Sequence, residues 1–184
     1  MRTLSDLLRN FMQLGYVTDD IDAAAAYLEA TLGTVTCVKH YRSELGGGLP
    51  PSAGGEPGAS FVVVDGKPAQ EWTIDVALVN AGPTNVEIIR PVGGAVDLYR
   101  AAVRPGVPAT LHHLGFVVDD FDEVDAVVTA AGKTWAQYGR SGGIRFGYLD
   151  LRAELGHFVE VMELDEASAD GFTQLEIASN AGRD

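Results

Sequence analysis

Cysteine is almost absent from the sequence, because Cys37 is the single cysteine among 184 residues. One thiol allows no disulfide within the chain and no thiolate zinc cluster, and it fits a reducing compartment. Long apolar runs are also missing, since no stretch approaches the ~20 residues that cross a bilayer. Residues 1–10 lack the basic-then-apolar order of a secretory signal. These absences predict a cytoplasmic protein without a membrane span.

Basic residues are scarce as well. The chain has 13 Lys and Arg against 26 Asp and Glu, which leaves a formal net charge of −13. This balance repels phosphate backbones and anionic membrane surfaces, so neither nucleic acid nor a membrane is an expected partner. Hydrophobic residues make up 46% of the sequence, the proportion of an ordinary globular protein. The length suits one average domain or two small halves.

An internal repeat organises the chain. Residues 11–22 (FMQLGYVTDDID) align with residues 111–122 (LHHLGFVVDDFD) at an offset of 100, with six identities in twelve positions. A second pair of similar segments follows these copies, VEII at 86–89 and VEVM at 159–162. Because the landmarks keep the same order in both halves, the repeat predicts two copies of one structural unit.

Each copy changes from a strand pattern to a helix pattern, since the apolar spacing passes from two residues to 3.6. The Asp pairs at the junctions predict N-caps, because a carboxylate accepts hydrogen bonds from unpaired backbone N–H groups. Gly33 and Gly132 stand where left-handed C-caps are expected. The predicted elements are strands at 11–17, 35–40, 61–65, 73–79 and 86–89 with a helix at 23–32, then strands at 111–118, 134–138, 144–150 and 158–163 with a helix at 124–131.

Strands outnumber crossover helices in this pattern, which predicts an α+β fold of two tandem βαβββ modules. A short helix is expected at 93–104 between the modules. The segment 46–58 holds six Gly and three Pro in thirteen positions, and it is either a disordered insertion or a lid over a pocket. The predicted division is a first module at 1–92 containing that insertion, a connection at 93–110, a second module at 111–164, and a tail at 165–184 that forms a peripheral helix or an arm to a partner subunit.

The repeat also pairs four polar side chains. It places Gln13 over His113, and the second pair of segments places Glu87 over Glu160. If the two units pack about a pseudo-twofold axis, their first and last strands curve into one cleft where these side chains converge. One imidazole, one amide oxygen and two carboxylates suit a divalent ion such as Zn, Ni, Co, Mn or Fe(II).

These motifs resemble the vicinal oxygen chelate superfamily, which includes glyoxalase I, methylmalonyl-CoA epimerase, type I extradiol dioxygenases and the fosfomycin and bleomycin resistance proteins. The similarity is carried by LHHLGFVVDDFD at 111–122, VEIIRPVGG at 86–94 and FVEVMEL at 158–164. It implies the curved mixed-sheet cleft of that fold. It also implies a divalent metal held by Gln13, Glu87, His113 and Glu160.

The ligand set Gln, Glu, His, Glu is similar to that of zinc-type glyoxalase I. However, Val17 and Pro91 stand where that enzyme carries the Arg and Asn that hold glutathione, so a glutathione adduct is not implied. Methylmalonyl-CoA epimerases resemble the second half but normally present His where this chain has Gln13. Extradiol dioxygenases use two His and one carboxylate, whereas this pattern offers one aligned His.

The resemblance implies proton-transfer chemistry on a small-molecule substrate. An α-oxygenated carbonyl or a thioester would chelate the metal, which stabilises the enediolate formed when a proton leaves carbon. The resemblance implies that Glu160 is the base and that Glu87 is a ligand or second base. The predicted function is that of a glyoxalase-type lyase, isomerase or epimerase that forms a homodimer. The alternatives are a metal-free small-molecule-binding protein of the resistance type and an extradiol-type dioxygenase.

Overall fold

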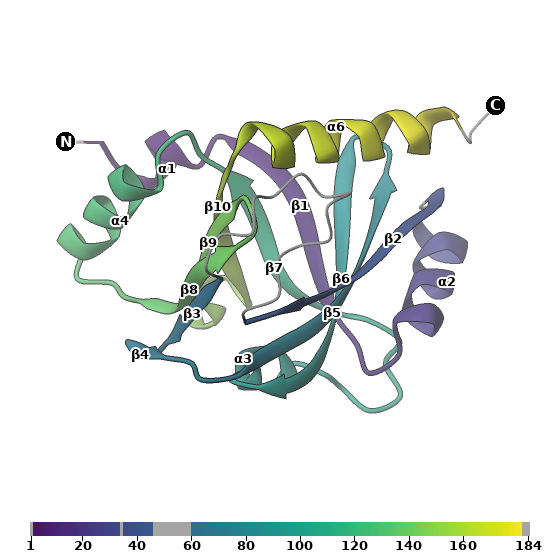
Figure 1. Cartoon of the computed structure of the whole chain (residues 1–184), viewed down its shortest axis with the longest axis horizontal. Helices are drawn as coiled ribbons and strands as arrows, with labels where there is room; N and C mark the ends of the chain where they lie inside the picture. The colour runs from purple at the N-terminus through teal and green to yellow at the C-terminus, as the bar shows by residue number, and fades with distance from the viewer. Residues whose placement is uncertain (1, 34, 46–59, 182–184) are drawn as a thin grey trace.

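The computed structural model of the chain describes residues 2–33, 35–45 and 60–181 (Figure 1). The segment 46–58, predicted as a disordered insertion or a lid, lies outside the described residues. Within the described part, no helix is both long and apolar enough to cross a membrane.

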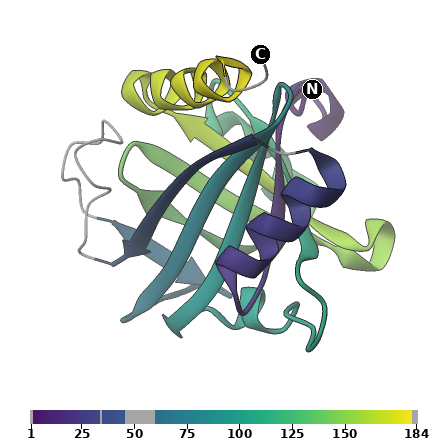
Figure 2. The same cartoon turned by 90° about the vertical axis from the view of Figure 1, so that its right-hand side faces the viewer.

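A ten-stranded mixed sheet forms the frame of the molecule. Its strands follow the order β2-β5-β6-β1-β7-β10-β9-β8-β3-β4, and the sheet curls into a half-barrel (Figures 1 and 2). The strands are β1 (Asn10–Val17), β2 (Val35–Glu44), β3 (Phe61–Val64), β4 (Lys67–Pro68), β5 (Trp72–Ala81), β6 (Thr84–Gly94), β7 (Thr110–Val117), β8 (Trp135–Ser141), β9 (Ile144–Leu151) and β10 (His157–Leu164).

The two copies of the repeat meet at the centre of the sheet. β1 and β7 pair antiparallel. On the two sides of this pair, β1 pairs parallel with β6, and β7 pairs parallel with β10. The next pairs outward, β5 with β6 and β9 with β10, are antiparallel. This arrangement relates the halves by a pseudo-twofold axis and confirms the predicted α+β fold.

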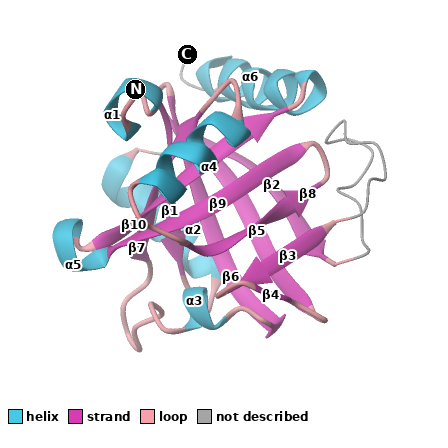
Figure 3. Ribbon diagram, turned by 90° about the vertical axis from the view of Figure 1, so that its left-hand side faces the viewer, coloured by secondary structure: helices cyan, strands magenta, loops and turns pink. Residues whose placement is uncertain are grey.

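Helices cover the outer face of the sheet. α2 packs on the β5–β6 side and α4 on the β9–β10 side (Figures 2 and 3). The helices are α1 (Leu4–Leu7), α2 (Ile21–Leu32), α3 (Asp97–Arg100), α4 (Phe121–Ala130), α5 (Arg152–Leu155) and α6 (Glu166–Ala181).

The ends of α2 and α4 follow the predicted capping chemistry. The side chains of Asp20 and Asp120 each accept a hydrogen bond from the backbone N–H three residues later, at 3.0 Å and 3.1 Å. Gly33 ends α2 with a φ of 64°, the left-handed conformation that glycine adopts without a Cβ clash. In α4 the cap itself is Ala131 in a right-handed conformation, and Gly132, with a φ of 68°, follows it.

The alternation of side chains along β6 and β10 sets what faces the interior of the half-barrel. In β6, Ile88 packs outward against α2, whereas Ile89 belongs to the interior core. In β10, Val161 packs outward against α4 and Met162 faces inward. Residues an even number of positions from Ile89 and Met162 therefore point into the interior, and both strands carry a glutamate there.

The helix predicted at 93–104 is shorter than expected. Only Asp97–Arg100 is helical, because β6 continues through Gly94 and pairs there with Trp72. Gly94 adopts a φ of 73°, and a Cβ atom on it would lie 2.2 Å from the backbone oxygen of Glu71. Gly93 and Gly94 are thus the last residues of β6, and the chain turns at Gly94. The helix therefore begins later than predicted.

The strand predicted at 61–65 lies on the opposite flank from its neighbours in sequence. β3 pairs with β8 of the second half, with Val63 opposite Tyr138, and not with the strands of its own half (Figure 3). Within the described residues, β3 and β4 together extend the flank that ends in β8. Pattern alone did not predict this crossing, since an edge strand accepts any partner whose backbone is unpaired.

The tail, predicted as a peripheral helix or an arm, forms helix α6. It lies across one end of the curled sheet (Figure 1). Phe172 and Leu175 pack against the interior core, and Phe172 also lines the internal cavity. The tail therefore closes one side of the interior.

Candidate metal centre

The pairing of β1 with β7 brings two of the predicted residues together. Gln13 lies opposite Gly115, and Gly15 lies opposite His113. The two glycines are equivalent in the repeat, as are Gln13 and His113. Each candidate side chain therefore lies beside a glycine from the other half.

Both glycines make room for these side chains. A Cβ atom on Gly15 would lie 1.8 Å from Cε1 of His113, within the space that the imidazole fills. A Cβ atom on Gly115 would lie 2.9 Å from Cβ of Gln13 and 2.9 Å from Cε of Met162. The role of the glycines was not predicted, although a signal was present: in both copies the glycine follows the candidate residue by two positions.

The two glutamates come from the neighbouring parallel strands. Glu87 of β6 lies beside Gly15, and Glu160 of β10 lies beside Gly115. Both are on the inward face described above. The structure thus brings all four predicted residues together, from the adjacent strands β6, β1, β7 and β10.

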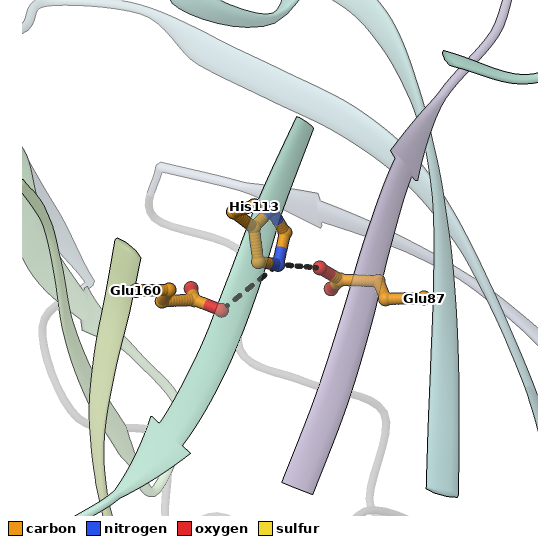
Figure 4. A group of neighbouring side chains, drawn as sticks. All are labelled: Glu87, His113 and Glu160. Carbon is orange, nitrogen blue, oxygen red and sulfur yellow. Dashed lines mark ion pairs between the residues drawn. The ribbon is translucent and has the colours of Figure 1, made fainter. Parts of the chain in front are cut away.

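His113 is the centre of this group (Figure 4). Its Nε2 lies 3.1 Å from Oε2 of Glu160, 3.4 Å from Oε2 of Glu87 and 3.5 Å from Oε1 of Gln13. The side chain of His113 is 0% exposed, that of Glu160 6% and that of Glu87 13%. The group is therefore almost fully shielded from bulk water.

Burial and charge act in opposite directions on His113. Burial by itself lowers the pKa of the imidazole, but Glu160 and Glu87 outweigh it and raise the pKa to about 9. Burial also raises the pKa of Glu87, an effect that His113 opposes and Glu160 reinforces. At neutral pH the metal-free protein consequently carries a proton on Nε2 of His113, between the two carboxylates.

The group fits a divalent cation. Oε2 of Glu160 is buried and lies 3.1 Å from Nε2 of His113, and no other hydrogen-bond donor among the described residues satisfies it. Two buried carboxylates facing one imidazolium leave a negative charge that a cation would compensate. Ligands ~2.1 Å from a tetrahedral metal lie ~3.4 Å apart, and the observed separations from His113 Nε2 are 3.1 to 3.5 Å. Oxygen and imidazole donors of this kind suit Zn, Ni, Co, Mn or Fe(II).

Gln13, Glu87 and Glu160 line a cavity of about 50 Å³ inside the half-barrel. Ser43 of β2 and Ser141 of β8 come from opposite flanks of the sheet, and their hydroxyls form a 2.7 Å hydrogen bond beside the cavity. Each ordered water needs roughly 10–15 Å³ of such space, so the cavity has room for a few small groups. The rest of its wall is mainly apolar and includes Trp72, Ile74, Val76, Ile144, Phe146, Met162 and Phe172.

A protein-family model decides the family of the chain. The model of the Glyoxalase/Bleomycin resistance protein/Dioxygenase superfamily matches residues 12–148, which is most of the sequence. The chain belongs to this superfamily. The predicted resemblance to the vicinal oxygen chelate proteins is thereby confirmed. A comparison with curated protein sequences gives no significant match.

Solved structures of methylmalonyl-CoA epimerases share this superfamily's fold with the chain. The Mycobacterium tuberculosis epimerase is 14% identical, with a TM-score of 0.53, over 89% of this chain and 93% of that one. A variant of the Streptomyces coelicolor epimerase in complex with 2-nitronate-propionyl-CoA is 18% identical, with a TM-score of 0.52, over 85% and 98% of the two chains. At these identities the similarity establishes the architecture alone.

Three tyrosines around this group of side chains were not among the predicted site residues. Tyr41, Tyr99 and Tyr148 line the cavity. Tyr148 lies opposite Glu160 in the β9–β10 pair, and its ring centroid is 5.2 Å from that of His113. Burial raises the pKa of Tyr148 and of Tyr41, and the nearby carboxylates raise both further. These phenols therefore stay neutral and can donate hydrogen bonds.

Proposed function

We propose that this chain is a divalent-metal-dependent lyase, isomerase or epimerase of the glyoxalase type. In this proposal it moves a proton on a carbon atom next to a carbonyl group of a small oxygenated substrate. The observation that carries the proposal is the buried convergence of Glu87, His113, Glu160 and Gln13, with ligand atoms 3.1 to 3.5 Å from His113 Nε2.

Gln13, Glu87, His113 and Glu160 are the residues that would hold the ion. A divalent ion bound there would act as a Lewis acid toward two adjacent oxygens of the substrate, which makes the neighbouring C–H group more acidic. The donor set suits Zn, Ni, Co, Mn or Fe(II) and does not select one of them.

Glu160 is the proposed base that takes the proton from carbon. Its side chain lines the cavity in which a small substrate would lie, and its Oε2 has His113 as its ion-pair partner among the described residues. Glu87 lies on the other side of His113 and is equivalent to Glu160 in the repeat. In an epimerase it would return a proton to the opposite face of the carbon; otherwise it serves as a plain ligand. Tyr148 and Tyr41, as neutral phenols, would donate hydrogen bonds to substrate oxygens.

Trp72 in the cavity wall supports a small substrate with a further oxygen. Nε1 of Trp72 is buried without a hydrogen-bond partner, and its ring stacks on Phe146 at 6.2 Å between centroids. An unsatisfied buried donor costs about 1–3 kcal/mol, which a substrate oxygen would recover. The apolar walls and the volume of about 50 Å³ favour a compact carbonyl compound or the acyl part of a thioester. The predicted homodimer stays a prediction.

Hydrogen exchange from candidate substrates tests the proposed function. Protein loaded with Co²⁺, Zn²⁺, Ni²⁺, Mn²⁺ or Fe²⁺ would be incubated in deuterium oxide with hydroxyacetone or methylmalonyl-CoA, and deuterium at carbon followed by mass spectrometry. We expect one ion per chain and metal-dependent exchange, with both lost in His113→Ala because the central ligand is removed.

Two outcomes of this experiment would contradict the proposal. Absence of bound metal after reconstitution, with small molecules still binding in the cavity, would indicate a metal-free binding protein. Oxygen uptake with catechols in the Fe²⁺ form, without exchange at carbon, would indicate a dioxygenase.

Metal affinity is expected to depend steeply on pH. A metal and a proton compete for Nε2 of His113, whose pKa in the metal-free protein is about 9. Affinity should therefore be highest above this pKa and fall about tenfold for each pH unit below it, to about 100-fold below the maximum at pH 7. Calorimetric titration in buffers of different ionisation enthalpy should show about one proton released per ion at neutral pH. Constant affinity across this range would place the titrating proton elsewhere.

A further inference from the structure

A buried chain of amides controls which atom of Gln13 faces the metal centre. Nδ2 of Asn85 donates to Oδ1 of Asn80 at 2.9 Å and to the backbone oxygen of Val79 at 3.4 Å. A backbone carbonyl can only accept a hydrogen bond, so the amide nitrogen of Asn85 must face β5. Its Oδ1 is then left to face Gln13.

The orientation of Gln13 follows from this contact. Nε2 of Gln13 donates to Oδ1 of Asn85 at 2.8 Å, between two residues that lie side by side in the β1–β6 pair. Oε1 of Gln13 is therefore the atom that faces Nε2 of His113, at 3.5 Å. Were the amide rotated by half a turn, its NH₂ group would take the place of Oε1 opposite His113 Nε2, and no lone pair would remain there for a cation.

A second chain of contacts acts on His113 through its neighbour His112. Nε2 of His112 lies 3.3 Å from the backbone oxygen of Leu98, so this nitrogen carries the hydrogen. Nδ1 of His112 lies 3.1 Å from Nδ1 of His113, and one hydrogen can lie between the two. Which residue supplies it depends on the surroundings of His112.

The surroundings of His112 assign that hydrogen to His113. The His112 ring is 2% exposed and lies against Tyr99 and Phe158, with centroids 5.1 Å and 4.7 Å away. With its Nε2 hydrogen directed at the Leu98 oxygen, a further hydrogen on Nδ1 would make His112 a cation with no carboxylate against it, whereas His113 has two carboxylates beside it. Nδ1 of His112 thus accepts, Nδ1 of His113 donates, and Nε2 of His113 faces the carboxylates.

We propose that Asn85 and His112 are positioning residues, which turn the oxygen of Gln13 and Nε2 of His113 toward one cation. The inference rests on the proposed function, because it concerns the same metal centre. Both chains of contacts begin at a backbone carbonyl, of Val79 in one case and of Leu98 in the other. The donor and acceptor roles are therefore set by the fold itself and are in place before any metal arrives.

Metal affinity in matched variants tests this inference. Asn85→Leu and His112→Leu should each weaken Co²⁺ binding by about 10- to 100-fold, as is usual for residues that orient metal ligands. His112→Asn should stay close to wild type, because its Oδ1 can replace Nδ1 as the acceptor. Thr18→Val is the matched control: this buried hydroxyl donates to the backbone oxygen of Pro108 at 2.8 Å, outside both chains of contacts. The readout is Co²⁺ titration by visible absorption at one fixed pH, with thermal unfolding of each metal-free variant.

The inference is overturned if Thr18→Val loses as much affinity as the two test variants, or if His112→Asn is as weak as His112→Leu. ¹⁵N NMR of metal-free wild-type protein adds a readout that needs no metal and no variant. We expect His112 to carry its hydrogen on Nε2, with Nδ1 bare; a hydrogen on Nδ1 overturns the inference. Wild-type protein that binds no Co²⁺ would instead contradict the proposed function, and the NMR result would then decide the hydrogen-bond roles alone.

Discussion

Glu160→Gln is expected to keep metal binding within about tenfold of wild type while slowing proton exchange by about 10²- to 10⁴-fold, the contribution usual for a general base. Glutamine has nearly the same shape as glutamate, and its amide oxygen remains a donor to a cation. The site already contains such a donor, because Oε1 of Gln13 lies 3.5 Å from His113 Nε2. An amide oxygen is far too weak a base, however, to take a proton from carbon.

The measurement is deuterium incorporation at carbon, with the metal content of each preparation determined in parallel. Glu163→Gln is the matched control on the same strand, because this carboxylate accepts a hydrogen bond from the backbone N–H of Phe121 at 2.9 Å, outside the cavity. We expect Glu163→Gln to exchange protons at the wild-type rate. Normal exchange in Glu160→Gln combined with loss of exchange in Glu87→Gln would indicate that Glu87, and not Glu160, is the base.

Gly15→Ala is expected to weaken metal binding by at least about 100-fold. The new Cβ atom would lie 1.8 Å from Cε1 of His113, so the imidazole cannot keep its present position. Either the imidazole leaves its position, which removes the central ligand, or β1 and β7 separate. In both cases the melting temperature of the metal-free protein should also fall, since overpacking a core typically costs about 1–3 kcal/mol.

Two glycines provide a graded comparison for this prediction. Gly115→Ala should have a smaller effect, because its Cβ would meet Cβ of Gln13 and Cε of Met162 at 2.9 Å, and the methionine end is flexible. Gly171→Ala should leave metal binding unchanged. Gly171 lies in helix α6, and a Cβ atom on it would meet no other atom within 4 Å. Equal metal affinity in Gly15→Ala and Gly171→Ala would show that His113 does not hold the ion.

Much of the local structure followed from the sequence because it depends on short-range physics. The Asp pairs predicted the caps of α2 and α4, and the change of period predicted the passage from strand to helix. The prediction of a helix over 93–104 was too long, although it also concerned local structure, because Gly94 was not recognised as the end of a strand. The pairing of β3 with β8 was not predicted, for a different reason: strand pairing depends on which distant strand edges are left unpaired.

The repeat was sufficient to select Gln13, Glu87, His113 and Glu160, because two equivalent units that pack symmetrically must place equivalent residues about one axis. The tyrosines around them were missed, since no pattern along the chain connects Tyr148 with Glu160. Their proximity arises from the antiparallel register of β9 and β10, which depends on the whole sheet.

The sequence by itself determined the two related halves, the strand and helix types, the negative net charge, and the identity of the four convergent side chains. Only the tertiary structure decided how these side chains face one another. Gly15 and Gly115 admit the side chains across β1 and β7, and Asn85 and His112 set their hydrogen-bond roles. The physical reason is that residue types are properties of the chain, whereas cross-strand register, burial and the direction of a lone pair exist only once distant strands have paired.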